Sequence, residues 1–427
     1  MCWTHRSHRV ETPGVDTNTT TDETIRGDAA VREERPHSAL RGWLGVAAIT
    51  ASLFAFLTTE LMPVGILTPV STSLGISVGV AGLMVTVYGV SAGLGVPFIV
   101  AWSRRVNRRV LLSALLAVLA AGNLVTAVSP NYPLVLATRL TMGFASGVFW
   151  AIGVSMAMRL VPERQASRAA AVVMSGISIA AVVGMPLGTF LEDLTGWRTT
   201  FLIWSGLSAL VFLAVAAVIP SLPSRNAVPV REVFALPLRN VRLRSVMFTV
   251  VLFVLGHFGA YTFVRPFLEG DSDASPASIT GLLMAYGIGG ALGNFIAGHT
   301  ATRHLKATFV TACSGLVASL LLLLTVGHWT AAPVVLLVVW GVSFGAWQLC
   351  QVNMTLAAAP DTFEAAMSLN TLAYNTSIAV GALFGGLFAD HLGVRSVLWF
   401  GAALTAASLL VTLAGVRRGR PASADAR

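Results

Sequence analysis

The chain has 427 residues, of which 55% are apolar and 11% charged, and its mean hydropathy is +0.76. A water-soluble protein of this length needs more charge on its surface, so the composition indicates an integral membrane protein. The net charge of +9 does not indicate a nucleic-acid partner, because the basic residues lie in short clusters between apolar runs and are not interleaved with aromatic residues.

The first segment, residues 1–42, is polar and contains mixed charges, many threonines and two prolines. It lacks a basic region followed by an apolar stretch and a small-residue cleavage site, so we do not interpret it as a signal peptide. We expect a disordered cytoplasmic tail. A start codon assigned too far upstream is the alternative.

A membrane-spanning helix needs about 20 mostly apolar residues. From residue 43 onward the sequence contains twelve such runs, which predict an all-α membrane protein. They occupy residues 43–69, 78–102, 110–128, 132–158, 167–191, 198–219, 243–268, 276–300, 306–326, 330–358, 365–389 and 395–415.

The charges in the loops predict the orientation of the chain. The loops after the second, fourth, sixth and eighth spans and the C-terminal end contain eighteen arginines and lysines, whereas the opposite loops contain three, Arg198, Arg265 and Arg395. Basic loops remain in the cytoplasm, so we expect both termini there and the protein in the inner (plasma) membrane of the cell.

Two pairs of segments show an internal repeat. The segment YGVSAGLGVPFIVAWSRR (88–105) matches YGIGGALGNFIAGHTATR (286–303) at an offset of 198, and GTFLEDLTGWR (188–198) matches GGLFADHLGVR (385–395) at an offset of 197. Corresponding spans have the same orientation, which predicts two six-helix bundles related by an axis along the membrane normal. The expected bundles are 43–219 and 243–416, with a cytoplasmic linker, 220–242, between them and a cytoplasmic tail, 417–427.

Five segments carry a resemblance to a known family. They are TELMPVGILTPV (59–70), RLTMGFASGVFW (139–150), AMRLVPERQ (157–165), GMPLGTFLEDLTGWRTTF (184–201) and GHFGAYTFVRPFLE (256–269). Residues 43 to about 416 resemble the major facilitator superfamily, and within it the twelve-span drug:proton antiporter group, near the branch of purine-ribonucleoside and arabinose-type efflux pumps. The resemblance implies a proton-coupled exporter of a small molecule.

Glu60 is the only one of the 19 acidic residues that lies within a predicted span. An ionisable group in the membrane interior is costly, roughly 2.5–3.5 kcal/mol, so such a residue is a functional candidate. We interpret Glu60 as the proton-binding carboxylate; a structural hydrogen-bonding acid is the alternative. Pro63 and Pro69 follow it and should free backbone groups beside the cavity.

The loop between the second and third spans resembles the family pattern G-x-x-x-D-R-x-G-R-R only at its basic end, Arg105, Arg108 and Arg109. Arg104 stands at the acidic position and Asn107 at the glycine position. The gating role that the resemblance implies for this loop is therefore in doubt.

Arg139 has the Arg-x-x-x-Gly spacing, up to Gly143, of the family's proton-relay motif. The resemblance implies that its charge responds to protonation of Glu60; a side chain that extends to the cytoplasmic surface is the alternative. The fifth span carries Gly176, Gly184, Pro186 and Gly188, which resemble the glycine-rich antiporter motif. Small residues there are expected to let helices of the two halves approach closely; ordinary packing is the alternative.

Polar and aromatic residues of four spans are candidates for the substrate cavity. His257, Tyr261 and Arg265 follow one another at steps of four, which predicts a shared helix face. His257 and Tyr261 are cavity candidates, with a satisfied helix contact as the alternative for His257, and Arg265 is expected at the outer mouth. The other candidates are Phe149, Trp150, Trp347, Gln348, Gln351, Asn370, Tyr374 and Asn375. Amides beside aromatic rings suit a flat, hydrogen-bonding molecule, although each of these residues alone is more often a packing residue.

The sequence gives no support for an enzyme, a metal site or a cofactor. Cys2, Cys313 and Cys350 are scattered singly, and the two GxSxG matches, around Ser91 and Ser343, lie inside apolar spans. No Walker A sequence is present, which argues against an ATP-driven pump. We predict a monomeric proton-coupled exporter of a drug, nucleoside or sugar. A proton-coupled uptake transporter and a transport-inactive membrane sensor are the alternatives.

Overall fold

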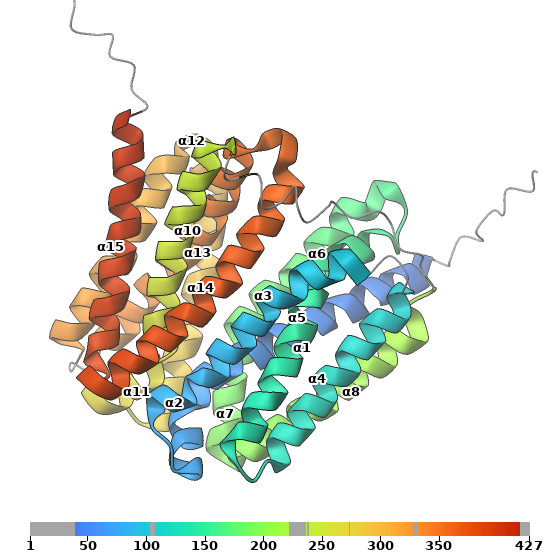
Figure 1. The fold of residues 1–427 in the computed structure, drawn as a ribbon, viewed down its shortest axis with the longest axis horizontal. Helices are drawn as coiled ribbons and strands as arrows, with labels where there is room; N and C mark the ends of the chain where they lie inside the picture. The colour runs from blue at the N-terminus through green and yellow to red at the C-terminus, as the bar shows by residue number, and fades with distance from the viewer. Residues whose placement is uncertain are drawn as a thin grey trace, which may run out of the picture.

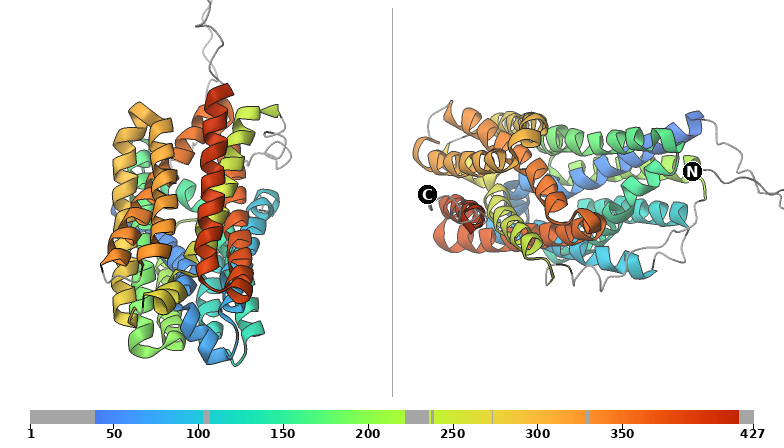
Figure 2. Two further views of the ribbon diagram at one scale, coloured as in Figure 1. Left: turned by 90° about the vertical axis from the view of Figure 1, so that its left-hand side faces the viewer. Right: turned by 90° about the horizontal axis from the view of Figure 1, so that it is seen from above.

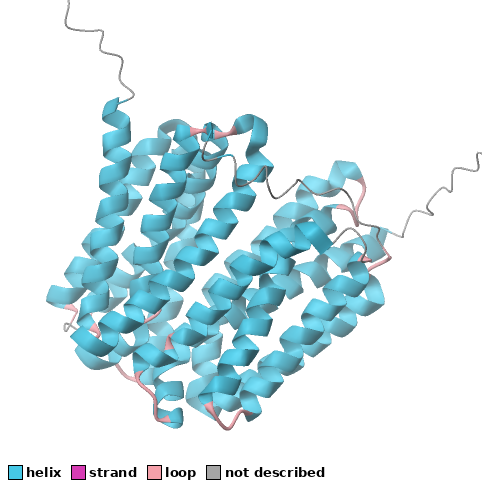
Figure 3. Ribbon diagram, viewed as in Figure 1, coloured by secondary structure: helices cyan, strands magenta, loops and turns pink. Residues whose placement is uncertain are grey.

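The computed structural model describes residues 39–102, 107–221, 236, 239–272, 274–327 and 331–418. This part of the chain consists of helices and short connections (Figure 3). The predicted tail up to residue 38, most of the predicted linker, the last residues of the C-terminal tail and Arg105 lie outside the described residues.

The first half of the described chain forms one helical bundle. Its elements are α1 (Ala39–Leu74), α2 (Val78–Ala81), α3 (Leu83–Trp102), α4 (Arg108–Val128), α5 (Tyr132–Met158), η1 (Glu163–Gln165), α6 (Ala166–Ile179), the π-helical turn η2 (Ala180–Gly184), α7 (Met185–Thr195) and α8 (Trp197–Val218). Together α6, η2 and α7 form the predicted fifth span, and α2 and α3 the second.

The second half forms the other bundle. Its elements are α10 (Val241–Tyr261), α11 (Val264–Asp271), α12 (Pro276–Val326), α13 (Ala332–Ala358), η3 (Pro360–Thr362), α14 (Phe363–Leu392) and α15 (Arg395–Arg418). Figures 1 and 2 show the two bundles side by side, the blue-to-green one formed by the first half and the yellow-to-red one by the second.

Helix α12 contains two of the predicted spans. Its 51 residues would extend about 75 Å as one helix, far beyond a hydrocarbon layer of about 30 Å. The backbone is non-helical at His304 (φ −138°, ψ 52°), between the predicted spans 276–300 and 306–326. Eleven described helices are long and apolar enough to cross a membrane, and α12 supplies two crossings. The predicted all-α fold of twelve spans is thereby confirmed.

Turn residues repeat in the two halves as the sequence pairs predict. Gly196 (φ 83°) follows α7 and Gly393 (φ 84°) follows α14, and both adopt a backbone conformation that side chains disfavour. Ser77 caps α2 and Ser275 caps α12 by accepting a hydrogen bond from the backbone three residues later. Each half therefore begins its second span and ends its fifth in the same way.

The repeat extends to a glycine pair that packs the interior of each half. Gly143 and Gly147 of α5 lie directly against the backbone carbonyls of Tyr88 and Ala92 in α3. In the second half, Gly341 and Gly345 of α13 lie in the same way against the carbonyls of Tyr286 and Gly290 in α12. The GxSxG sequence around Ser343 is thus part of a GxxxG helix-packing motif, which lets two backbones touch.

The halves meet along α3 and α14, and at one end of the molecule further helices join this contact. Here α14 contacts α2, α12 contacts α7, and α11 contacts α1. Figure 1 shows the bundles close together at α2, α7 and α11, and farther apart at the end where α15 terminates. We refer to the end that carries Ser77, Glu192, Arg265 and Asp390 as the closed end.

Candidate functional site

Glu60 lies in α1, and the proline that follows it changes the hydrogen bonding of the helix beside it. Pro63 has no N–H group, so the carbonyl of Thr59, four residues earlier, lacks its usual helical partner. Arg139 of α5 occupies this vacancy: its Nη1 donates a hydrogen bond of 2.8 Å to the Thr59 carbonyl. The backbone carbonyl that Pro63 was predicted to free therefore has a specific hydrogen-bond donor, Arg139.

Arg139 is fully buried, with 0% of its surface exposed. Its guanidinium carbon lies 5.0 Å from the ring centre of Phe201 and 5.9 Å from that of Tyr88. Its Nε and Nη2 have no hydrogen-bond partner among the described residues. The alternative that Arg139 extends to the cytoplasmic surface is therefore wrong. The side chain is instead a buried cation bonded to the peptide that precedes Glu60.

The carboxyl group of Glu60 sits among polar side chains of both halves. Ser146 and Trp150 of α5 lie beside it from the first half, and Tyr374 of α14 in the second half is close enough to interact electrostatically with it. Oε2 of Glu60 is shielded from solvent and has no hydrogen-bond partner among the described residues. Such a carboxyl group in the membrane interior is placed where the two halves meet.

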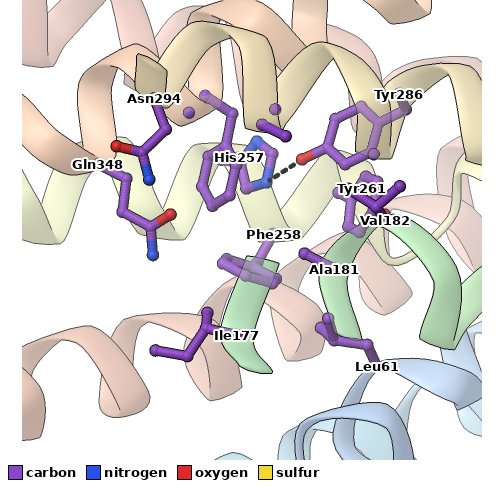
Figure 4. A pocket seen from close by; sticks show the side chains of 15 residues that line it. Leu61, Ile177, Ala181, Val182, His257, Phe258, Tyr261, Tyr286, Asn294 and Gln348 are labelled. Atoms are coloured by element: carbon purple, nitrogen blue, oxygen red, sulfur yellow. Dashed lines mark hydrogen bonds between the residues drawn. The ribbon is translucent and has the colours of Figure 1, made fainter. Parts of the chain in front are cut away.

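A pocket lies between the halves, and Leu61, the residue after Glu60, is part of its lining. The first half contributes Leu61 of α1 and residues 177, 181 and 182 of α6 and η2, and the second half contributes α10, α12 and α13 (Figure 4). The cavity volume of the pocket is about 90 Å³, which is smaller than that of a typical small-molecule site. None of the described residues that line it is an aspartate, glutamate, lysine or arginine.

His257 is fixed at the wall of this pocket by two hydrogen bonds. The indole Nε1 of Trp340 donates to its Nδ1 at 3.0 Å, and its Nε2 lies 3.3 Å from the hydroxyl of Tyr286. An indole N–H can only donate, so Nδ1 acts as acceptor and the ring is neutral in this arrangement. His257 therefore lines the pocket and is also fully hydrogen-bonded.

Aromatic rings extend from His257 across the pocket. Phe344 stacks on the imidazole at 4.0 Å between ring centres, and Tyr261 stacks at 5.3 Å. Phe258 meets Tyr374 edge-on at 6.1 Å, which connects the pocket to the neighbour of Glu60. The predicted pocket residues Tyr261 and Gln348 are in its lining.

Two side-chain amides complete the pocket. Gln348 of α13 and Asn294 of α12 are half-buried, and Figure 4 shows both to the same side of the His257 ring. Neither amide has a hydrogen-bond partner among the described residues. A half-buried, free amide is available to a ligand, which explains how an otherwise aromatic pocket can select for hydrogen-bonding molecules.

Comparisons with known proteins agree with this architecture. The sequence profile of the Major Facilitator Superfamily matches residues 46–362 and 247–427. The chain belongs to the Major Facilitator Superfamily. Two crystal structures of a bacterial homolog of the human lysosomal transporter Spinster have the same fold.

The first Spinster-homolog structure, inward-facing and unoccupied, gives a TM-score of 0.71 at 14% identity and covers 91% of this chain and 100% of the homolog. The second, inward-facing and occupied, gives 0.70 at 16% identity and covers 89% and 98%. At identities this low, the structural match shows a shared fold and does not indicate the substrate of this chain.

Several residues that were predicted to line the cavity of this superfamily member lie outside the pocket. Phe149 stacks on Phe56 at 4.7 Å, and Trp347 stacks on Phe253 at 3.9 Å, both inside hydrophobic cores. These two rings are buried by packing within their own half and do not line the pocket.

The remaining predicted amides, Gln351 of α13 and Asn370 and Asn375 of α14, are buried. Gln351 and Asn370 each have a side-chain oxygen without a hydrogen-bond partner among the described residues. Asn375 donates to the Thr371 carbonyl at 2.9 Å and lies against α3 of the other half. It therefore belongs to the contact between the halves.

The glycines of the fifth span pack against α1 of their own half. Gly176, Gly184 and Gly188 lie close to Thr50, Thr58 and Met62, respectively. The expectation that they bring the two halves together was wrong, because the small residues accommodate the threonines of α1. The contact between halves comes from the adjacent π-helical turn η2, whose residues 181 and 182 pack against Gly287 of α12.

Two further predictions concern the ends of helices. Arg109 binds the Ala216 carbonyl of α8 in its own half, and Arg108, at the start of α4, is buried. The prediction that His257, Tyr261 and Arg265 share one helix face is wrong for Arg265. Helix α10 ends at Tyr261, and Arg265 belongs to a separate helix, α11, which begins at Val264. Pro266 accounts for this break, since it cannot continue the helical hydrogen bonding.

Proposed function

We propose that this protein is a secondary active transporter that exports a small amphipathic molecule, such as a drug, a nucleoside or a sugar, in exchange for protons. The observation that supports this most directly is the position of Glu60. It is the acid of α1 within the membrane interior, it adjoins both halves, and one of its oxygens lacks a partner among the described residues.

The carboxyl group of Glu60 supplies the proton site. A negative charge in a dry, low-dielectric region is unfavourable, so the group binds a proton when the surrounding helices exclude water. When the halves separate and water reaches it, the ionised form becomes stable and the proton leaves. Proton binding is thereby tied to the state of the contact between the halves, which includes Tyr374.

Arg139 connects the protonation of Glu60 to the packing of α1 against α5. Its guanidinium holds the Thr59 carbonyl, which belongs to the peptide unit next to Glu60. An ionised Glu60 attracts the cation, and a protonated one does not, so protonation changes the force between α1 and α5. Pro63 makes this possible, because a normal helix would have its own N–H on the Thr59 carbonyl.

The pocket supplies the substrate site. Its aromatic wall of His257, Phe344 and Tyr261 suits a flat ring, and the free amides of Asn294 and Gln348 suit polar substituents on that ring. The described lining residues include no aspartate, glutamate, lysine or arginine, which favours a molecule that is neutral when bound.

We infer from the loop charges that the closed end faces the outside of the cell, so that the opposite end, where the halves are farther apart, faces the cytoplasm. The two Spinster-homolog structures with the same fold are inward-facing. A pocket that is reached from the cytoplasm is the loading state of an exporter.

The test is efflux from an efflux-deficient host supplied with a panel of nucleosides, sugars and antibiotics. Wild type should lower the internal concentration of at least one compound, and collapse of the pH gradient should abolish this effect. Glu60→Gln should be inactive, whereas Glu163→Gln, an exposed acid of η1, should retain activity. Gradient-dependent efflux by Glu60→Gln would overturn the proton site, and accumulation in place of efflux would establish the uptake alternative.

A further inference from the structure

Arg265 joins the two halves at the closed end. Its Nη1 donates to the carboxylate of Glu192 in α7 at 2.7 Å and to the backbone carbonyl of Gly65 in α1 at 2.5 Å. Arg265 belongs to α11 of the second half, and both of its partners belong to the first. Only 3% of the Arg265 side chain is exposed, so these bonds are shielded from water.

The Gly65 carbonyl is available because of a proline. Pro69, four residues later, has no N–H group to donate to it, and the α1 backbone departs from helical geometry at Ile66 (φ −128°, ψ 16°). The arrangement repeats that of Pro63, whose freed carbonyl at Thr59 is held by Arg139. Each proline inside α1 thus leaves one carbonyl open, and each carbonyl is taken by a buried arginine.

Acidic groups surround Arg265 on several sides. Glu269, on its own helix, accepts from Nε at 2.8 Å, and Asp193 of α7 lies 3.8 Å from Nη2. With Glu192, three carboxylates surround one guanidinium, which orients its planar fork toward the first half. Charged hydrogen bonds with this little exposure are stronger than those on an open surface.

Asp390 makes a second connection, directed from the second half to the first. One carboxylate oxygen accepts from the Ser77 hydroxyl at 2.6 Å, and the other accepts from the backbone N–H of Gly79 at 2.9 Å. Both partners lie at the start of α2. Gly79 also lies against the backbone of Gly386, so the two helices touch beside the carboxylate.

The internal repeat relates these connections. Asp193 and Asp390 occupy equivalent positions in the matched segments at the ends of the fifth and eleventh spans. Asp390 reaches the start of the second span in the other half, and Asp193 accepts a hydrogen bond of 3.3 Å from Thr280, near the start of α12. The equivalent of Arg265 in the first half is an apolar residue, Leu67, so only one of the two connections contains an arginine.

Ion pairs between described residues join the halves only at this end. Those that cross from one half to the other all use Arg265, whereas the pair of Arg395 with Asp271 at 2.9 Å stays within the second half. A connection confined to one end holds that end shut and leaves the other end free to separate.

We propose that Arg265, with Glu192 and the Gly65 carbonyl, and Asp390, with Ser77 and Gly79, are two latches that hold the closed end shut and must release for the substrate pocket to open on that side. The proposal extends the proposed transport function by naming the contacts that set its resting state. It is independent of the substrate, of the direction of transport and of Glu60 as proton site.

The test measures the distance between the halves at the closed end by pulsed electron paramagnetic resonance. Spin labels are placed on Thr72 of α1 and Leu392 of α14, which are both exposed, in a background whose native cysteines are alanine. The protein is purified without substrate or a proton gradient. The variants are Asp390→Ala, Arg265→Ala and, as the matched control, Arg395→Ala, which removes an ion pair at the same end within one half.

We expect one dominant short distance in wild type and in Arg395→Ala. In Asp390→Ala and Arg265→Ala, the ratio of a longer to the short distance should rise about tenfold, as expected for loss of a charge-assisted hydrogen bond. If Arg265→Ala does not fold, Asp390→Ala decides the outcome, because its contact lies at the surface. A wild-type distribution in the latch variants, or an equal shift in Arg395→Ala, would overturn the proposal.

Efflux assays on the same variants separate this proposal from the proposed function. A shifted distance distribution together with no efflux of any compound by wild type supports the latches and rejects the exporter. Efflux by wild type together with unchanged distances in both latch variants supports the exporter and rejects the latches.

Discussion

Substitution of Gly147 by alanine tests how the glycine pairs support the site. Gly147 is buried in α5, and a Cβ added there falls on the backbone carbonyl of Ala92 in α3. A carbonyl within a helix cannot turn aside as a flexible side chain does, so the two helices must separate. Overpacking of this kind destabilises a protein by about 1–3 kcal/mol.

The matched control is Gly206→Ala. Gly206 is exposed on α8 with no atom within 4 Å of an added Cβ, so alanine should only improve the helix, by up to about 1 kcal/mol. The same chemical change should therefore have opposite signs at the two positions, with a difference of roughly 1–4 kcal/mol.

The assay is thermal unfolding in detergent, followed with a thiol-reactive dye that gains access to the buried Cys313 and Cys350 when the fold opens. Gly147→Ala should unfold below wild type and Gly206→Ala at or above it. Because Ser146 beside Glu60 precedes Gly147, Gly147→Ala should also reduce transport in surviving protein. An unfolding temperature of Gly147→Ala that equals that of Gly206→Ala would refute the packing argument.

Three further predictions follow from the site. Pro63→Ala supplies an N–H that competes with Arg139 for the Thr59 carbonyl. The thermal stability of the protein should rise, and its proton-driven transport should fall. Unchanged transport would contradict the role of the freed carbonyl. Gln348→Leu removes a half-buried free amide, so the KM for substrate should rise about tenfold with no loss of thermal stability. An unchanged KM would show that Gln348 does not contact the substrate. Trp340→Phe leaves Nδ1 of His257 without its donor and should lower the free energy of unfolding by about 1–3 kcal/mol in denaturant titrations.

The helical spans were accessible from the sequence because lipid imposes a simple rule. Each crossing must satisfy its own backbone hydrogen bonds over about 20 apolar residues, so the runs are visible without knowledge of their neighbours. The same logic identified Glu60 as an unusual acid and predicted that Pro63 and Pro69 would free backbone groups. It could not identify Arg139 and Arg265 as the partners, because these arginines arrive from other helices.

The lining of the pocket was harder to predict, because membrane helices are apolar on every side. Hydropathy does not distinguish a ring that faces the pocket, such as Phe344, from one that packs in a core, such as Trp347. The Trp340 indole became significant only when the fold placed it against His257. Its place in the apolar run 330–358 gave no signal. The GxxxG spacing of GFASG (143–147) and GVSFG (341–345), at an offset of 198, was visible in the sequence.

The central claim is that Glu60 carries the proton that is exchanged for substrate. The most direct measurement is proton movement in liposomes that contain the purified protein and a pH-sensitive dye, after addition of a transported compound. We predict a substrate-stimulated proton flux for wild type and for Glu163→Gln, and none for Glu60→Gln. A flux of wild-type size through Glu60→Gln would contradict the account.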